Sequence, residues 1–412
     1  MRTSIFLSLT CLGAIACAPA DDASLDAGPP VDAGKPLSAM PAIADLEGET
    51  WHAIEPGGDT ICSRGQPWAF FFRPGVVNKL VVEFQGGGAC WNYPTCSVAD
   101  MIFKDNIDDI RGTVLGDACA SDSDCAEDSE CLTSGYCRRP DPERGIYDHS
   151  NDDNPVKGWN HLFIPYCTGD IHWGRSVVEY ASEGGAAPFM LNHQGAVNAE
   201  VALRWVRENV PQPETIFIGG CSAGAYGAIG WAPHVMRDFP ESKVVQLGDC
   251  GAGIITDSFL RDSFPVWSAL ETLPAWIDAL DPNTIDINTM ELKDLYAEVG
   301  KFYGDQTISQ YNTVFDNNQV FYYDTMGGSG GAEQWSAKMR DQIYRIGQEA
   351  DNFRSYIAPG DQHCIIHRNE LYSVDTNGDG SGVKLVDWIR EMVDSDAPDS
   401  VACSGCEPEP LP

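Results

Sequence analysis

The segment from Thr215 to Gly224 constrains the fold of this chain more than any other. Thr215–Ile218 has the composition of a short buried strand, and it leads directly into Gly219-Gly-Cys-Ser222-Ala-Gly224. A helical pattern follows Ser222 and ends near Pro240. Glycines are needed beside such a serine, because a tight strand-to-helix turn leaves no room for Cβ atoms. The segment therefore predicts a nucleophile elbow, with the Ser222 hydroxyl exposed at the edge of a sheet.

The rest of the chain alternates short apolar runs with helical patterns, as expected of an α/β sheet. A helix capped by Asn198 is predicted to reach Val210, and a last helix is predicted over Leu385–Val393. Residues 258–312 are expected to be a mostly helical excursion. We therefore expect one α/β domain over residues 45–400, with a mostly parallel sheet flanked by helices. The predicted strands are Phe70–Arg73, Leu80–Phe84, His161–Pro165, Thr215–Ile218, Val244–Leu247, Thr313–Phe315 and Tyr356–Ala358.

Composition restricts the partners and the compartment. The chain has 412 residues, and 26 Lys+Arg against 61 Asp+Glu give a formal net charge of −35. Such a charge repels nucleic acid and anionic lipid headgroups, so we expect neither as a partner. Fifteen cysteines favour an oxidising compartment in which disulfides form.

The amino terminus predicts export. Arg2 is the only charge before an apolar run from Ile5 to Ala16, which is too short to span a bilayer. The run is typical of a signal peptide over the first 16 residues. Small residues precede Cys17 as in a bacterial lipobox, which predicts Cys17 as the lipidated first residue of the mature protein. Ordinary cleavage near Ala18 or Ala20 is the alternative.

Two segments flank the expected domain. Residues 17–44 are rich in Ala, Asp, Pro and Gly, which predicts a flexible acidic tether. Residues 401–412 are expected to be a C-terminal tail. We therefore expect a bacterial cell-surface lipoprotein that meets the membrane only through a lipid anchor, or a secreted protein if cleavage is ordinary.

A cysteine-rich insert is expected over residues 117–140. Its cysteines are evenly spaced in a stretch dense in Asp, Glu and Ser, at Cys119, Cys125, Cys131 and Cys137. A zinc site is disfavoured, because zinc-binding pairs lie two to four residues apart and the compartment is oxidising. The spacing favours a small surface insert held by two disulfides.

The number of cysteines in the mature protein predicts one unpaired thiol. Without Cys11 in the signal peptide and Cys17 at the lipid site, thirteen of the fifteen remain, which is an odd number. Cys221, inside the elbow, is our first candidate for the unpaired thiol. Cys90–Cys96 and Cys403–Cys406 are expected short-range pairs, although connectivity does not follow from sequence.

A serine nucleophile needs donors for the oxyanion. The strand Leu80–Phe84 ends in Gln85-Gly-Gly-Gly88-Ala89-Cys90, which is similar to a glycine-rich oxyanion loop. We expect the backbone N–H groups of Gly87 and Gly88 to face the substrate oxygen, with that of Ala223 as the further donor. A flexible hairpin is the alternative for the three glycines.

A serine nucleophile also needs a base, which in this fold comes after the acid along the chain. Three histidines follow Ser222. His363 follows a strand and a Pro-Gly-Asp turn, which suits a catalytic loop. His367 lies in the next apolar stretch and is a weaker candidate. His234 lies inside the helix after the elbow, where a structural or surface residue is expected.

The orienting acid has three candidates. Asp316 follows the predicted strand Thr313–Phe315, the position that an orienting carboxylate needs. Asp249 follows another predicted strand and competes with Asp316. Asp257 is a more distant competitor.

With these motifs in order, the sequence resembles the pectin acetylesterase/Notum family over most of residues 60–392. The resemblance implies a serine carboxylic ester hydrolase of α/β-hydrolase-like fold that needs no cofactor. It implies a catalytic triad of Ser222, Asp316 and His363. The matching motifs are Gly86-Gly-Gly88-x-Cys90, Asn154-Pro155 with Trp159-Asn160, Pro165-Tyr-Cys-Thr-Gly-Asp170, Gly220-Cys-Ser-Ala-Gly224, Asp249-Cys-Gly251, Val314-Phe-Asp316 and His363-Cys364.

Two features depart from the family pattern. The family often has an aromatic residue within its glycine loop, where this chain has Gly88-Ala89. The insert over residues 117–140 also lies outside the pattern. Because the aromatic residue is missing, the resemblance does not define the shape of the acyl pocket.

A calcium loop is suggested by Asp375, Asn377 and Asp379. The twelfth position of such a loop requires a bidentate glutamate, but this chain has Val386 there. An Asp/Gly-rich turn is the alternative, and it is the one that the sequence favours.

Three functions of different classes follow from these observations. The first is an esterase that removes acetyl groups from a plant-type or other polysaccharide. The second is an esterase or lipase for longer acyl chains. The third is a surface lipoprotein that binds glycans without catalysis, but a binder has no use for a complete Ser/Asp/His set. The negative charge favours a neutral acylated polymer over de-esterified pectin.

Overall fold

The computed structural model describes residues 35–126, 129–132, 134–182, 184–395 and 397–411. The predicted signal peptide, the lipidation site Cys17 and most of the predicted tether lie outside these residues. The last ten residues of the predicted tether are held on the domain. The Ser38 amide donates to the carbonyl of Pro56 (2.7 Å), and the Trp205 indole donates to the carbonyl of Pro41 (2.9 Å). The tether prediction was therefore wrong for residues 35–44, because their backbone is hydrogen-bonded to the domain.

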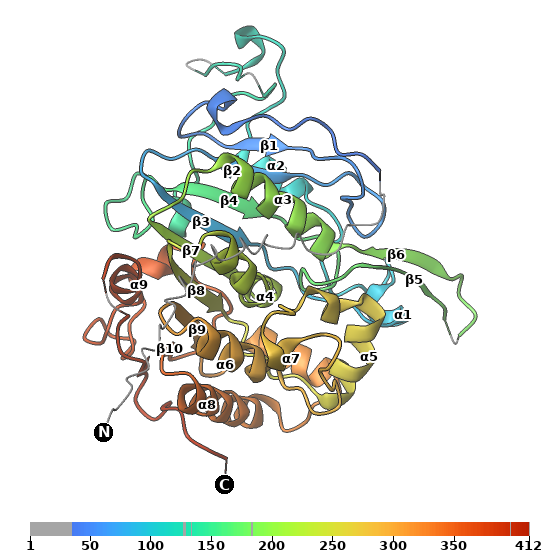
Figure 1. Ribbon diagram of the computed structural model, residues 1–412, viewed down its shortest axis with the longest axis vertical. Helices are drawn as coiled ribbons and strands as arrows, with labels where there is room; N and C mark the ends of the chain where they lie inside the picture. Colours follow the sequence, from blue (N-terminus) through green and yellow to red (C-terminus); the bar gives the residue numbers. More distant parts are fainter. Residues whose placement is uncertain (1–34, 127–128, 133, 183, 396, 412) are drawn as a thin grey trace, which may run out of the picture. The chain divides into compact units, whose positions relative to one another are not determined.

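The described part of the chain forms a nine-stranded sheet in the order β1-β2-β4-β3-β7-β8-β9-β10-β11 (Figure 1). Neighbours from β4 to β11 pair in parallel, whereas β1 with β2 and β2 with β4 pair antiparallel. The mostly parallel sheet agrees with the predicted α/β class. The strands are β1 His52–Ile54, β2 Phe70–Arg73, β3 Lys79–Phe84, β4 Asn160–Ile164, β7 Thr215–Cys221, β8 Lys243–Asp249, β9 Thr307–Thr313, β10 Phe353–Ala358 and β11 Val401–Ala402.

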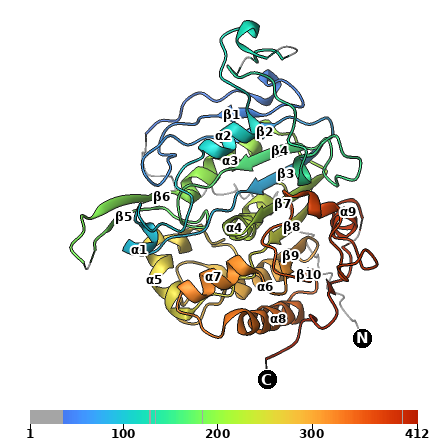
Figure 2. The same ribbon diagram turned by 180° about the vertical axis from the view of Figure 1, so that it is seen from behind.

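Alternate strand residues point to opposite faces of the sheet, and each face has its own apolar core. On β7, Ile216 and Ile218 join one core, while Phe217 joins the other. The first core packs under α3 (Gly195–Asn209), α4 (Ala223–Asp238), α6 (Leu292–Phe302) and α8 (Gly331–Glu349). The second core packs under α2 (Asp108–Val114) and α9 (Leu385–Asp394), which Figure 2 brings to the front.

The remaining elements lie mostly around the carboxyl ends of the parallel strands. They are α1 Tyr93–Cys96, α5 Asp257–Trp267, α7 Asn317–Thr325 and the hairpin of β5 Ser176–Tyr180 with β6 Phe189–His193. Short 3₁₀ helices are η1 Ile43–Asp45, η2 Asp122–Asp124, η3 Gly145–Tyr147, η4 Ala269–Thr272, η5 Asp278–Leu280 and η6 Asn369–Tyr372. No helix in the described ranges is long and apolar enough to cross a membrane.

Two predicted elements were misplaced. Strand β9 runs over Thr307–Thr313, upstream of the predicted Thr313–Phe315 and inside the segment expected to be helical. Its buried residues are mostly polar, and Ser309 Oγ donates to the carbonyl of Gln246 (2.5 Å), so composition hid the strand. Asn198 does not cap α3 but lies within its first turn. Its side chain bonds the amide and the carbonyl of Ile61, both at 3.0 Å.

The predicted C-terminal tail begins with a strand of the sheet. Val401 pairs with Tyr356 and Ala402 with Ile357, which adds β11 to the edge of β10. The Cys403 amide then donates to the carbonyl of Ile357 (2.9 Å). The domain therefore extends beyond the boundary predicted at residue 400, because β10 would otherwise leave its edge groups without partners.

The insert is held as predicted by two disulfides, Cys119–Cys131 and Cys125–Cys137. Its four sulfur atoms are therefore used in covalent bonds and do not form a zinc site. The insert is attached to the end of α2, where the Arg139 guanidinium donates to the carbonyl of Gly112 (2.6 Å).

Four further disulfides form in the described residues: Cys62–Cys167, Cys90–Cys96, Cys221–Cys364 and Cys403–Cys406. The two predicted short-range pairs are confirmed. The prediction of Cys221 as the unpaired thiol was wrong, because the loop after β10 brings Cys364 against the end of β7. Among the described residues the free cysteine is Cys250, which is buried. Six disulfides are typical of proteins that fold in an oxidising compartment.

Candidate active site

Ser222 lies at the turn between β7 and α4, as the sequence predicted. Its backbone has φ 57° and ψ −121°, a strained conformation for a residue with a side chain. The flanking glycines are required by space, because a Cβ on Gly224 would lie 1.9 Å from the carbonyl oxygen of Phe84. Ala223 is the first residue of α4. Its N–H therefore has no acceptor within the helix and lies at the positive end of the helix dipole.

His363 and Asp316 are brought together from two loops at the carboxyl ends of β10 and β9. The imidazole Nδ1 lies 2.9 Å from each carboxylate oxygen of Asp316. Asp316 is fully buried and caps α7, where it accepts hydrogen bonds from the amides of Asn318 (3.0 Å) and Gln319 (2.9 Å). The carboxylate is thus fixed by backbone donors, and it can in turn fix the tautomer and orientation of the imidazole.

A cavity of about 50 Å³ is shared by the elbow and the loop that carries His363. Ser222, Ala223 and His363 all line it. The free thiol of Cys250 lines it as well, a residue that the sequence reasoning missed. Its position directly after β8, the neighbour of β7, was the available signal. Most of the remaining lining is apolar and includes Ile171, Ile254, Phe259, Phe264, Leu292 and Met326.

The glycine loop contributes two residues to the cavity. Gly88 and Ala89 line the cavity, whereas Gly87 is not among its described lining residues. The Gly87 carbonyl accepts a hydrogen bond from the Lys104 amide (2.8 Å). Gly88 has φ +76°, and a Cβ there would lie 2.0 Å from the hydroxyl oxygen of Tyr322. Gly88, Ala89 and Ala223 therefore line the cavity, and the choice of oxyanion donors stays a prediction.

The competing acids have other partners. The carboxylate of Asp249 accepts hydrogen bonds from the amides of Ile365 (2.8 Å) and Ile366 (3.0 Å), so it binds backbone rather than His363. Burial raises the pKa of Asp249. Asp257 is exposed at the start of α5 and does not belong to the cavity lining.

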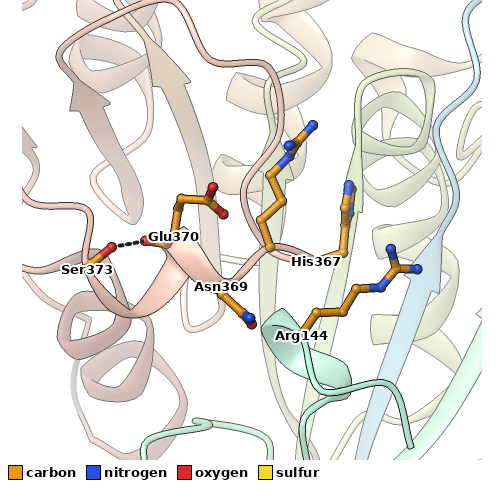
Figure 3. Close-up of a pocket in the computed structure, with 6 residues that line it drawn as sticks. Arg144, His367, Asn369, Glu370 and Ser373 are labelled. Carbon is orange, nitrogen blue, oxygen red and sulfur yellow. Dashed lines mark hydrogen bonds between the residues drawn. The ribbon is translucent and has the colours of Figure 1, made fainter.

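The other two histidines after Ser222 lie outside the cavity lined by Ser222 and His363. His234 Nε2 lies 2.9 Å from the carbonyl oxygen of Thr272, and burial lowers the pKa of His234 to about 4. Burial likewise lowers the pKa of His367. His367 faces a different, larger cavity of about 680 Å³, shown in Figure 3 with Arg144 and Ser373. The Ser373 hydroxyl there donates to the carbonyl of Glu370 (3.4 Å) and not to His367.

The calcium motif folds as a turn. Asp375 accepts hydrogen bonds from the amides of Asn377 (2.8 Å), Gly380 (2.7 Å) and Gly382 (3.1 Å). Its carboxylate is therefore already used by the backbone. Val386, at the position where calcium needs a bidentate glutamate, is buried on α9. This donor set does not fit a calcium ion.

Comparison with known proteins agrees with this geometry. The sequence model of the pectinacetylesterase family matches residues 112–261, a segment that contains Ser222 but ends before Asp316 and His363. The predicted resemblance to pectin acetylesterases is confirmed. No curated protein sequence matches the chain.

Solved structures share the fold. The Wnt deacylase Notum from Drosophila, in crystal form II, superposes with a TM-score of 0.55 and 17% sequence identity, over 88% of this chain and 100% of that chain. Its crystal form I gives a TM-score of 0.52 and 16% identity, over 87% and 92%. At this identity the likeness establishes a Notum-like α/β-hydrolase fold. The family match and the fold together support a carboxylic ester hydrolase.

Proposed function

We propose that this protein is an exported serine esterase that removes short acyl groups, acetyl above all, from a polysaccharide. The observation that carries the proposal is the single cavity shared by Ser222 and His363, with His363 held by the buried Asp316. Ser222, His363 and Asp316 come from three separate loops, yet Ser222 and His363 line one cavity and the Asp316 carboxylate binds the His363 imidazole. Their convergence is the arrangement that acyl transfer requires.

In the proposed mechanism, His363 accepts the Ser222 proton as the hydroxyl attacks the ester carbonyl carbon. Asp316 stabilises the imidazolium that forms. The N–H groups of Ala223 and of the Gly88–Ala89 segment are the proposed donors to the oxyanion. His363 then protonates the leaving alcohol and yields an acyl-serine. Water, activated by the same imidazole, releases the carboxylic acid and regenerates Ser222.

The size of the cavity supports a short acyl group. A volume of about 50 Å³ has room for a few atoms beside Ser222, which suits an acetyl group but not a long hydrocarbon chain. Apolar side chains line much of the cavity and limit its size, including Phe259 on α5 and Met326 after α7.

Esters of longer acids are the second candidate function. The apolar lining favours it, because hydrocarbon binds by removing apolar surface from water. This candidate requires the wall formed by Phe259 and Met326 to move outward.

A panel of p-nitrophenyl esters of increasing chain length tests both candidates. We expect kcat/KM to be highest for the acetyl ester and to fall at or before the octanoyl ester. The Ser222→Ala variant should lose at least about a thousandfold in kcat while its melting temperature stays close to that of the wild type. Residual turnover within tenfold of the wild type would reject the serine mechanism. An octanoyl optimum would favour the second candidate instead.

We also propose that Cys17 carries a lipid and anchors the enzyme at a bacterial cell surface. The support is the sequence ahead of Cys17 together with the six disulfides, which suit an exported protein.

A further inference from the structure

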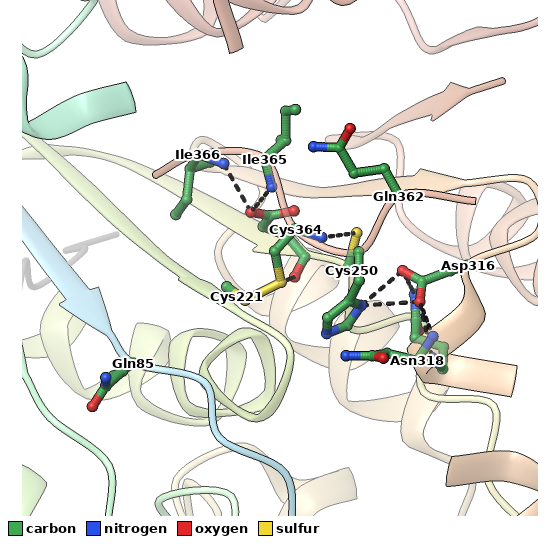
Figure 4. The surroundings of a disulfide bond; sticks show 12 residues. Gln85, Cys221, Cys250, Asp316, Asn318, Gln362, Cys364, Ile365 and Ile366 are labelled. Carbon is green, nitrogen blue, oxygen red and sulfur yellow. Dashed lines mark hydrogen bonds and ion pairs between the residues drawn. A yellow bond between two sulfur atoms is a disulfide. The ribbon is translucent and has the colours of Figure 1, made fainter. Parts of the chain in front are cut away.

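A disulfide joins the two loops that carry the proposed nucleophile and base. Cys221 directly precedes Ser222, and Cys364 directly follows His363. The two cysteines are 143 residues apart in sequence, with their Cα atoms 5.6 Å apart. Because consecutive Cα atoms are about 3.8 Å apart, the Cα atoms of Ser222 and His363 cannot separate by more than about 13 Å while this bond is intact. Figure 4 shows the disulfide and its surroundings.

The end of β8 ties the same two loops together without covalent bonds. The Asp249 carbonyl accepts a hydrogen bond from the Ser222 amide (2.8 Å). The Asp249 carboxylate binds the amides of Ile365 and Ile366, two and three residues after His363. The Cys250 sulfur accepts a hydrogen bond from the Cys364 amide (3.2 Å). Asp249 therefore holds the nucleophile loop with its backbone and the base loop with its side chain.

The loops need this restraint, because their backbones are strained. Ser222, Cys250 and Cys364 all have positive φ, at 57°, 58° and 62°. Residues with side chains stay in this region only when their surroundings over-determine them. Without the restraint, each loop would relax toward a commoner backbone conformation and would carry Ser222 or His363 with it.

We propose that the Cys221–Cys364 disulfide, assisted by Asp249, is a positioning element for the proposed reaction. It holds Ser222 and His363 in reacting geometry, and its loss lowers the rate of acyl transfer beyond any loss of stability. The inference rests on the proposed serine mechanism. None of these groups touches the reacting atoms, so they position the catalytic residues rather than act on the substrate.

The neighbouring thiol does not weaken the restraint. Cys250 lies close enough to Cys364 for its sulfur to be within 4.8 Å of the Cys364 sulfur. Attack on a disulfide requires a thiolate. Burial raises the pKa of Cys250 well above its usual value, so its thiolate is scarce and exchange is slow.

The test compares two double variants. Cys221→Ala/Cys364→Ala removes the positioning disulfide. Cys62→Ala/Cys167→Ala removes a disulfide of similar loop length, 105 residues against 143, between segments that carry no member of the proposed triad. Because the entropic effect of a disulfide grows only slowly with loop length, both variants should lose similar stability. The melting temperature of each variant is measured first. At a temperature below both values, we then measure kcat and KM for an acetyl ester and the rate at which a phosphonate modifies Ser222.

We expect kcat and the phosphonate reaction to fall at least tenfold in Cys221→Ala/Cys364→Ala, with KM within about twofold of the wild type. The control variant should keep kcat within about twofold. A folded Cys221→Ala/Cys364→Ala variant with wild-type kcat would overturn the proposal, and so would an equal loss in both variants. The Ser222→Ala variant tests the proposed function separately, because its residual activity depends on the serine mechanism and not on the disulfide.

If Cys221→Ala/Cys364→Ala does not fold, Asp249 provides the second test. Asp249→Ala removes the side-chain acceptor for Ile365 and Ile366, whereas Asp249→Asn keeps an acceptor oxygen. We expect Asp249→Ala to lose at least tenfold in kcat and Asp249→Asn to recover most of it. Wild-type kcat in a folded Asp249→Ala variant would contradict the proposal.

Discussion

The imidazole Nδ1 of His363 lies 2.9 Å from both carboxylate oxygens of Asp316, although the two residues are 47 positions apart in the chain. Asp316 has no exposed surface, and the side chain of His363 is 16% exposed. An ionised carboxylate at this depth needs donors, and the first turn of α7 provides them through the amides of Asn318 and Gln319. The acid is thus fixed before any substrate binds.

The first prediction separates the two buried acids near His363. Asp316→Asn should lower kcat by roughly 10⁴, because it removes the negative charge that stabilises the imidazolium and favours the wrong tautomer. Asp249→Asn should keep kcat within about tenfold, because Asp249 binds backbone amides that an asparagine oxygen can also bind. Steady-state kinetics on both variants decides this. If Asp249→Asn lost most of its kcat while Asp316→Asn stayed active, Asp249 rather than Asp316 would be the orienting acid.

The second prediction concerns the glycine loop. Gly88→Ala should lower kcat by about 10²–10³, because its Cβ would meet the Tyr322 hydroxyl at 2.0 Å and the Ile102 carbonyl at 2.2 Å, displacing the proposed oxyanion donors. Gly112→Ala is the control, since Gly112 lies on α2 with open space around a new Cβ. It should keep full activity and the stability of the wild type or slightly more. Wild-type kinetics in Gly88→Ala would remove this loop from the proposed oxyanion hole.

Several parts of the fold and the candidate site followed from sequence because they depend on local chemistry. The elbow was readable because a serine between glycines after a buried strand has few other uses. His363 and Asp316 were the leading candidates because each follows a predicted strand, and the structure brings the two side chains together. The fold predictions for β2, β7 and α4 succeeded because their apolar patterns are unambiguous.

Other features depend on contacts that no local pattern reveals. The Cys221–Cys364 disulfide joins segments 143 residues apart, and nothing in the spacing of cysteines selects that pair. Strand β9 is buried yet polar, and its burial depends on tertiary hydrogen bonds such as those of Ser309 with Gln246 and of Asn312 with Gln319. Which residues of the glycine loop line the cavity depends on how the loop packs, and the sequence of the loop does not reveal this.

The third prediction concerns acid stability. Burial lowers the pKa of His172 to about 4, of His193 to about 3 and of His234 to about 4, from an unfolded value near 6.5. Between pH 6.5 and 4 the unfolded chain therefore binds protons that the folded chain does not. The free energy of unfolding should fall as the pH drops through this window and be greatest above pH 6.5. Burial raises the pKa of Asp170 to about 6, which opposes the effect by one proton at most.

Denaturant unfolding at several pH values measures this slope. His193→Gln should reduce it by up to about 1.4 kcal/mol per pH unit, which corresponds to one proton. The His193 ring bonds the Tyr180 hydroxyl (2.8 Å) and the Thr168 carbonyl (2.9 Å), so the variant is less stable at neutral pH as well. An unchanged slope would mean that His193 is not a neutral buried group.

The fourth prediction concerns Cys17, which lies outside the described residues. Cys17→Ser, or treatment of producing cells with globomycin, should convert a membrane-anchored protein into a soluble or unprocessed one. Fractionation of cells and mass spectrometry of the amino-terminal peptide measure the change. Native protein without lipid, with an amino terminus beyond Cys17, would rule out the anchor and leave ordinary secretion.

The fifth prediction concerns the charge of the polymer. At a net charge of −35 the enzyme approaches a polyanion against a repulsive field. Four basic residues of the domain are each paired with an acid and so offset little of this field: Arg64 with Asp105 (3.6 Å), Arg73 with Asp141 (2.7 Å), Lys79 with Asp394 (3.2 Å) and Arg175 with Glu200 (2.8 Å). We therefore expect a higher kcat/KM for a neutral acetylated polysaccharide than for de-esterified acetylated pectin.

Ionic strength tests that reasoning. Salt screens exposed charges over about 10 Å at 0.1 M, so the gap between the two polymers should narrow as salt rises. Steering acts on association, so the change should appear in kcat/KM, while kcat and the hydrolysis of uncharged p-nitrophenyl acetate stay constant. A preference for the acidic polymer that weakens with salt would contradict the prediction. It would mean that a local basic surface outweighs the net charge, and pectin would become the favoured substrate.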